Sequence, residues 1–280
     1  MADLGARLPE EKGYPADRTG ITVYRSSCLR RPAVTATPAI APSWARTPRS
    51  DLPLLVVGLL LVLVVVLAGF APTFYLKSLF GTPPLSNLLF AHGLVMSTWI
   101  ALLVAQTALV EFGRTDLHRR VGVAGAGVAA LLVVIGVAAA LEAARRGFSP
   151  TPKVTPLMFL AIPLVDLLVF SILVGTALAM RRKVAAHKRL MLLATVGMLT
   201  PAVARLPIDA LKQVGLPAFF AVTIVCVLLV VGFDAVRHRR LHPAFGWGAA
   251  LVIAAVPGRI ALAQSDAWVS IAGRLVAMLG

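Results

Sequence analysis

Four ionisable side chains lie within long apolar stretches of this sequence: His92, Asp166, Arg205 and Arg259. Such a group in a membrane helix costs on the order of 3 kcal/mol on insertion scales, so each is a functional-site candidate. An acid, two guanidinium groups and an imidazole at one depth can bind a polar or anionic ligand, with His92 giving or taking a proton. The structural alternative is that Asp166 pairs with Arg205 to fix helix packing, while both arginines extend to the membrane interface.

Gln106 is a fifth candidate because it shares a helical face with His92. Met96, Trp99, Leu103 and Gln106 follow His92 at offsets of 4, 7, 11 and 14 residues, which keeps them nearly in line on a helix. We therefore expect this polar face to point into a helix bundle.

Three short segments repeat a histidine followed by basic residues: "RTDLHRRV" at 114–121, "KVAAHKRL" at 183–190 and "RHRRL" at 237–241. One interpretation is that these basic segments fix membrane topology and bind anionic lipid headgroups. The alternative is that His118, His187 and one of His238 or His242 converge as haem or metal ligands. No HExxH pattern and no ligating cysteine accompanies them, so we predict no metal site and no catalytic residue.

The composition shows which elements must position these residues. With 59% hydrophobic and 14% charged residues, the chain is too apolar for a soluble domain of 280 residues. The net charge of +15 is dispersed between apolar segments, which argues against a nucleic-acid partner. A helix needs about 20 apolar residues to cross a bilayer. This rule predicts seven spanning helices, over 53–72, 86–110, 121–143, 155–179, 190–207, 216–235 and 245–263.

The predicted architecture is an all-α, polytopic transmembrane bundle in which an anchoring helix precedes three hairpins. Residues 1–50 read as a disordered basic tail, 51–264 as the transmembrane domain and 265–280 as a short interfacial segment. The loops richest in Lys and Arg belong in the cytoplasm, so we expect the N-terminus inside. Gly122, Gly125 and Gly127 are expected to allow close helix approach.

The segments "FAPTFYLKSLF" (70–80), "AHGLVMSTWIALLVAQTALV" (91–110), "GRTDLHRRVG" (113–122) and "AHKRLMLLATVGMLTPAVARLP" (186–207) resemble a widespread bacterial family of uncharacterised multi-pass membrane proteins. The resemblance covers most of residues 53–245 and implies a place in the bacterial cytoplasmic membrane. "HGLVMSTW" is also faintly similar to helices of b561-type cytochromes, in which helix histidines hold haem. That similarity implies a haem b alternative, with Met158 as a second axial ligand for His92.

For function, we expect a non-enzymatic membrane protein that binds or moves a small polar or lipidic ligand through the outer-half network. No nucleotide-binding loop, nucleophile elbow or metalloprotease helix is found, which argues against a soluble-type active site. Two alternatives remain open at this point. One is a b-type haem protein for electron transfer or haem handling, although no cofactor is expected in the leading interpretation. The other is an assembly or scaffold protein with a membrane-protein partner, and the sequence leaves homo-oligomer formation undecided.

Overall fold

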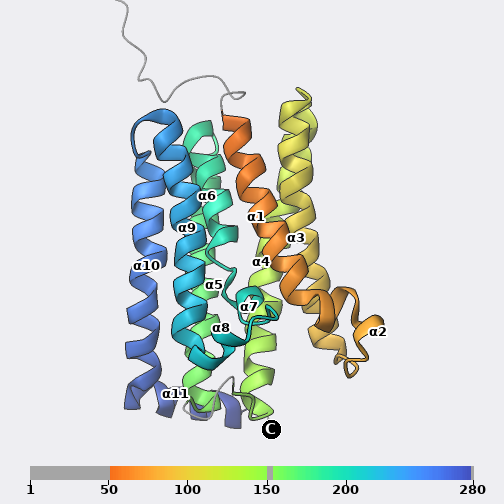
Figure 1. Ribbon diagram of the computed structural model, residues 1–280, viewed down its shortest axis with the longest axis vertical. Helices are drawn as coiled ribbons and strands as arrows, with labels where there is room; N and C mark the ends of the chain where they lie inside the picture. Colours follow the sequence, from red (N-terminus) through yellow and green to blue (C-terminus); the bar gives the residue numbers. More distant parts are fainter. Residues whose placement is uncertain (1–50, 150–153, 279–280) are drawn as a thin grey trace, which may run out of the picture. The chain divides into compact units, whose positions relative to one another are not determined.

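The computed structural model describes residues 51–149 and 154–278, and every regular element in these two ranges is a helix (Figure 1). Within these two ranges, six helices are long and apolar enough to cross a membrane: α1 (Leu52–Phe70) with its continuation η2 (Ala71–Tyr75), α3 (Asn87–Glu111), α4 (Thr115–Arg145), α5 (Pro156–Ala179), α9 (Leu216–His238) and α10 (Pro243–Gln264). The predicted all-α polytopic bundle is confirmed. The predicted basic tail, residues 1–50, lies outside the described residues.

The surface of the bundle explains why these segments are helices. Large apolar side chains remain exposed along the helices, for example Leu60 at 55%, Val64 at 64% and Leu229 at 59%. In hydrocarbon, backbone groups have no water to bond, so a chain with such a surface must pair them within each helix. The exposed apolar side chains are therefore the lipid-facing surface of the bundle.

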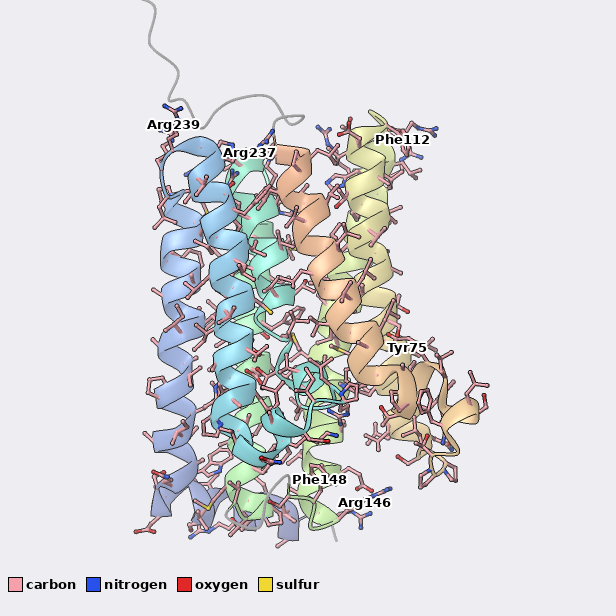
Figure 2. The ribbon with its side chains drawn as sticks, in the orientation of Figure 1. Tyr75, Phe112, Arg146, Phe148, Arg237 and Arg239 are labelled. Atoms are coloured by element: carbon pink, nitrogen blue, oxygen red, sulfur yellow. The ribbon has the colours of Figure 1, made fainter. Side chains whose placement is uncertain are left out.

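The long helices run up and down the bundle, with α5 and α9 in the same direction because residues 184–203 return between them, so the loops gather at two ends (Figure 1). Figure 2 shows Phe112, Arg237 and Arg239 at one end, with Arg146 and Phe148 at the other. We call the first the basic end, defined by residues 112–120, 181–189 and 237–242, and the second the opposite end. The expected hairpins are present, because α3 packs on α4, α5 on α6 (Val184–Val196) and α9 on α10.

The prediction of a continuous helix over 190–207 is wrong. α6 begins at Val184 and ends at Val196, and a four-residue helix, α7 (Thr200–Val203), follows an irregular turn. Pro201 has no N–H to donate to the carbonyl of Gly197, and its ring clashes with a continuing helix. The amides of Met198 and Leu199 turn instead to the carbonyls of Thr195 and Val196, both at 3.2 Å. The segment is thus an interrupted helix in the interior of the bundle (Figure 1).

Close helix contacts occur at glycines other than those expected. A Cβ at Gly125 or Gly127 would meet nothing within 4 Å, and one at Gly122 would meet only the Gln106 amide at 3.6 Å. In contrast, a Cβ at Gly69 would lie 2.2 Å from the carbonyl oxygen of Ala202. The backbone of α1 therefore touches that of α7 directly, and this contact needs a glycine.

Three short helices lie toward the opposite end: α2 (Lys77–Phe80), α8 (Asp209–Val214) and α11 (Asp266–Ala277). α11 falls in the segment expected to be interfacial. Its Trp268 indole donates to the carbonyl of Leu157 at 2.9 Å, and its Ala272 is fully buried. The C-terminal segment is therefore a helix packed against the first turn of α5.

Candidate functional site

Asp166 and Arg259 form a buried ion pair between α5 and α10. Nη1 of Arg259 donates to Oδ1 of Asp166 at 2.5 Å, and the two residues are 2% and 6% exposed, respectively. The Arg259 Nε donates to the carbonyl of Ala255 at 3.1 Å, and the guanidinium lies 5.0 Å from the ring centroid of Phe220. The structure thus pairs Asp166 with Arg259 instead of Arg205, and both charged groups are already engaged.

His92 and Arg205 form a second and more open unit. Nδ1 of His92 is buried, yet it has no hydrogen-bond partner among the described residues. Arg205 follows α7, is exposed, and donates from Nη1 to the carbonyl of Pro201 at 2.8 Å. Both residues lie beside the end of α1: Arg205 contacts Phe70, and Phe74 packs on Gly93, the residue after His92. The predicted network of four groups is therefore two separate pairs, and only this one retains unused polar groups.

Aromatic residues at the end of α1 contact Arg205 and the residue that follows His92. The guanidinium of Arg205 lies 4.9 Å from the ring centroid of Phe70, the last residue of α1. One turn later, in η2, the Phe74 ring packs so closely on Gly93 that a Cβ there would lie 2.3 Å from it. Single π-helical turns are frequent at functional sites. Here the π-helical turn carries the chain from the Arg205 side to the His92 side.

A small cavity lies next to this pair, between α1, α3 and the break after α6. It has a volume of about 20 Å³ and is lined by Val62, Val66, Met96, Trp99, Ile100, Thr195, Met198 and Leu199. The indole of Trp99 donates to Oγ1 of Thr195 at 3.1 Å, which engages both polar side chains of the wall. Met96 and Trp99, two members of the face predicted from His92, therefore line an apolar cavity.

Gln106 does not join this unit. In the orientation that satisfies both ends of its amide, the oxygen accepts from the amide of Gly122 at 2.9 Å. The amide nitrogen then donates to Nδ1 of His118 at 2.7 Å. Gln106 thus links α3 to the first turns of α4 near the basic end.

A buried charge cluster at the basic end was not predicted from the sequence. Arg189 donates to both carboxylate oxygens of Asp234, at 2.9 and 2.6 Å, and to those of Asp51, at 3.2 and 3.3 Å. Nζ of Lys188 lies 2.5 Å from Oδ2 of Asp51, and Nε2 of His238 lies 2.9 Å from Oδ1 of Asp51. A signal was present, because Asp234 is an acid within an apolar run and Asp51 directly precedes one.

Opposing effects act on the carboxyl group of Asp51. Burial alone would raise its pKa, but the hydrogen bonds and charges of Lys188 and Arg189 outweigh burial and hold the pKa below its usual value. The ligand atoms of Asp51, Asp234 and His238 lie within 4.8 Å of one another, close enough for one metal ion. Arg189 and Lys188 already neutralise both carboxylates, however, so the cluster is better described as an ion-pair network.

The histidines proposed as haem candidates make other bonds. Nδ1 of His187 contacts the carbonyl of Ala177 at 2.8 Å, and Nδ1 of His238 contacts the carbonyl of Asp234 at 3.0 Å. A haem bound at His238 would require its Nε2 to give up the contact with Asp51. Met158 lies in the first turn of α5, where its amide donates to the Thr155 hydroxyl at 3.2 Å.

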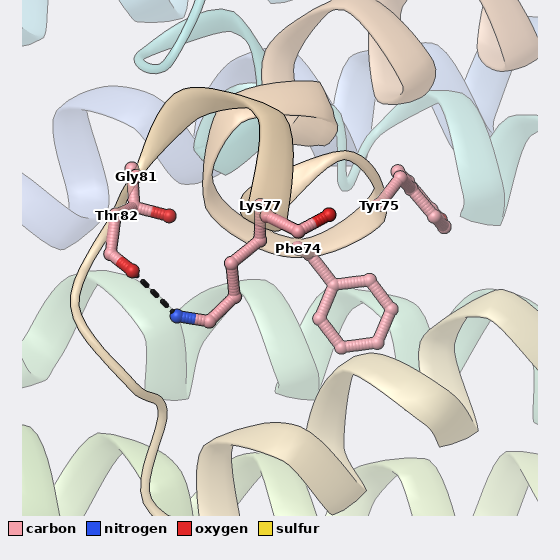
Figure 3. Close-up of a pocket in the computed structure, with 6 residues that line it drawn as sticks. Phe74, Tyr75, Lys77, Gly81 and Thr82 are labelled. Carbon is pink, nitrogen blue, oxygen red and sulfur yellow. Dashed lines mark hydrogen bonds between the residues drawn. The ribbon is translucent and has the colours of Figure 1, made fainter.

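An open pocket of about 480 Å³ lies beside α2 at the opposite end (Figure 3). It is lined by Phe74, Tyr75, Lys77, Ser78, Gly81 and Thr82. Nζ of Lys77 donates to the carbonyl of Thr82 at 2.8 Å and also to that of Pro83. Lys77 holds the loop after α2 through these two hydrogen bonds, so its charge is less available to a ligand than that of Arg205.

No protein-family model, curated protein or solved structure matches this chain. The candidate site therefore rests on geometry alone, and the unit of His92 and Arg205 is the strongest that the described residues offer.

Proposed function

We propose that this membrane protein binds a small anionic ligand with Arg205 and His92, in the half of the membrane that faces away from the cytoplasm. The observation that supports this most directly is the contrast between the two arginines. Arg259 has a carboxylate partner at 2.5 Å, whereas none of the ion pairs among the described residues includes Arg205.

The chemistry of the two side chains favours an anion. A guanidinium is always charged and presents five N–H donors in a planar fork that matches a carboxylate or a phosphate. The His92 ring adds a nitrogen that is shielded from solvent and can accept or donate one hydrogen bond. Phe70 covers one face of the guanidinium, which limits its hydration and strengthens attraction to a counter-charge.

The interrupted helix beside the site favours movement of the ligand as well as binding. In membrane transporters, ligand sites are often formed where a membrane helix is discontinuous. Here the break at 197–199 separates α6 from α7, and Arg205 follows α7 by two residues. A shift of α7 would therefore move Arg205 relative to the long helices.

Binding can be tested with the full-length protein in nanodiscs of zwitterionic phosphatidylcholine. Methyl phosphate is expected to raise the thermal unfolding temperature at pH 7. Arg205→Gln should weaken binding about tenfold to a hundredfold, because a hydrogen bond to a charged group contributes about 1.5–3 kcal/mol.

Lys212→Gln is the matched control, because Lys212 is also a cation after the helix break and is half exposed beside Asp209. This variant should bind methyl phosphate as the wild type does. Equal binding by Arg205→Gln and the wild type, or no stabilisation of either, would refute the proposal.

A further inference from the structure

On both α3 and α1, a residue at the anion site lies four positions from a residue that lines the small apolar cavity. On α3, His92 precedes the cavity residue Met96 by four positions, or about 6 Å along the axis. On α1, Phe70, which contacts Arg205, follows the cavity residue Val66 by four positions. Because α1 and α3 run in opposite directions, the cavity lies one turn deeper than the anion site on both helices.

The cavity is suited to an apolar guest. Its volume of about 20 Å³ admits roughly one water molecule, but the hydroxyl of Thr195 already bonds to Trp99 and to the carbonyl of Met191. Apolar cavities of this kind stay dry, so a hydrocarbon group fits it better than water.

The side chains that line the cavity can rearrange to accommodate a longer hydrocarbon chain. Met96 and Met198 form part of the lining, and methionine side chains adapt readily to different shapes. Leu199 and Met198 belong to the helix break, where the regular hydrogen bonds of a helix are replaced by short turns. Two of the three elements around the cavity thus have adaptable parts.

The outer surfaces of the same two helices are apolar at this depth. Leu67 of α1 is 49% exposed, and Leu94 of α3 is 55% exposed. In a bilayer such side chains contact lipid tails, so a ligand with a hydrocarbon chain can reach the site sideways from the membrane.

We propose that the ligand of Arg205 and His92 is an anionic amphiphile, with its charged head at these residues and its hydrocarbon chain between α1 and α3 at the cavity. This inference rests on the proposed function and specifies its ligand class. Such a ligand carries a phosphate or carboxylate head on an alkyl chain. The competing possibility is that the ligand is a water-soluble anion without a chain.

Two probes distinguish these two kinds of ligand: dodecyl phosphate and methyl phosphate, each titrated into the full-length protein in phosphatidylcholine nanodiscs. Val66→Phe fills the cavity and should weaken dodecyl phosphate binding about tenfold, which corresponds to the loss of about two buried methylene groups. The same variant should bind methyl phosphate as the wild type does. Leu67→Phe, its neighbour on the lipid-facing side of α1, should change neither affinity.

Met96→Ala provides a second test that does not overfill the core. Because this change widens the cavity, it should leave methyl phosphate binding unchanged and tighten the binding of dodecyl phosphate. If Val66→Phe fails to fold, this variant decides the question, and unchanged or weaker dodecyl phosphate binding would overturn the inference.

The outcomes distinguish the two proposals. Equal wild-type affinity for both probes, with a loss of both in Arg205→Gln, would overturn the amphiphile inference and leave the anion site standing. Binding of dodecyl phosphate that is insensitive to Arg205→Gln, to Val66→Phe and to Met96→Ala would indicate simple partition into the bilayer and would overturn both.

Discussion

Arg189 of α6 donates to both carboxylate oxygens of Asp234 in α9, at 2.9 and 2.6 Å, and the two residues are 2% and 1% exposed. The same guanidinium also reaches Asp51 at the start of α1 and lies 5.9 Å from the ring centroid of Phe245 in α10. One side chain thus joins four helices at the basic end.

Replacement of Arg189 should be strongly destabilising. Arg189→Met leaves the buried carboxylate of Asp234 without its closest partner and removes two hydrogen bonds from Asp51, and removal of one member of a buried ion pair typically costs about 3–5 kcal/mol. Thermal unfolding in detergent measures the effect. Arg181→Gln, which removes an exposed arginine at the same end, should change stability by only about 0.5 kcal/mol. Similar unfolding temperatures for the two variants would show that the cluster is not structural.

Acid should weaken the basic end through Asp51. The pKa of Asp51 in the folded protein lies below its ordinary value of 3.8, so the carboxylate stabilises the fold above that pH. This stabilisation is lost as the pH falls from about 3.8 through the lower folded-state pKa. Unfolding temperatures measured between pH 6 and pH 2 should therefore fall less steeply for Asp51→Asn than for the wild type. Asp209→Asn, at an exposed acid, should keep the wild-type slope.

The contact between α1 and α7 should be intolerant of a methyl group. Gly69→Ala forces a Cβ against the carbonyl oxygen of Ala202 and should cost about 1–3 kcal/mol, as overpacking does elsewhere. Gly125→Ala meets no atom within 4 Å and should be neutral or stabilising by up to about 1 kcal/mol, since alanine favours helix. The two unfolding temperatures should therefore move in different directions, and a stable Gly69→Ala protein would contradict the contact.

The ion pair between Asp166 and Arg259 should be replaceable as a unit. Arg259→Leu alone leaves a buried acid and should lower the unfolding temperature, whereas Asp166→Leu/Arg259→Leu should recover most of the loss because apolar residues can substitute for a buried pair. Methyl phosphate binding at Arg205 should persist in the double variant. A double variant that folds but no longer binds the anion would place this pair in the ligand site.

Membrane orientation follows from the basic end. If the positive-inside rule holds for this chain, a reporter inserted after Phe148 should report the outside and one inserted after Arg182 the inside. The reverse pattern would move the Arg205 site to the cytoplasmic half and would require the ligand to come from that side.

The spanning helices could be predicted because hydrocarbon imposes a local rule: a run of about 20 apolar residues has to pair its own backbone groups. The same rule failed at 190–207, where apolar composition hid the effect of Pro201 on the backbone. Gln106 shows that two residues on the same face of a helix do not have to belong to the same site. It lies in line with His92, but more than three helical turns separate the two residues. The Gln106 side chain forms its hydrogen bond with His118 on the next helix.

The sequence by itself determined the helical class, six of the seven predicted apolar spans, the gathering of basic residues at one end and the four ionisable residues within apolar runs. Tertiary structure alone decided that Asp166 pairs with Arg259, that Arg205 stays without an acid among the described residues, and that Arg189 joins Asp51 to Asp234. Hydropathy and charge bias are properties of each segment separately, so the features that depend on them can be predicted from the sequence. Ion pairing depends on which helix faces pack together across separations of 45 to 138 residues, and no local pattern encodes that choice.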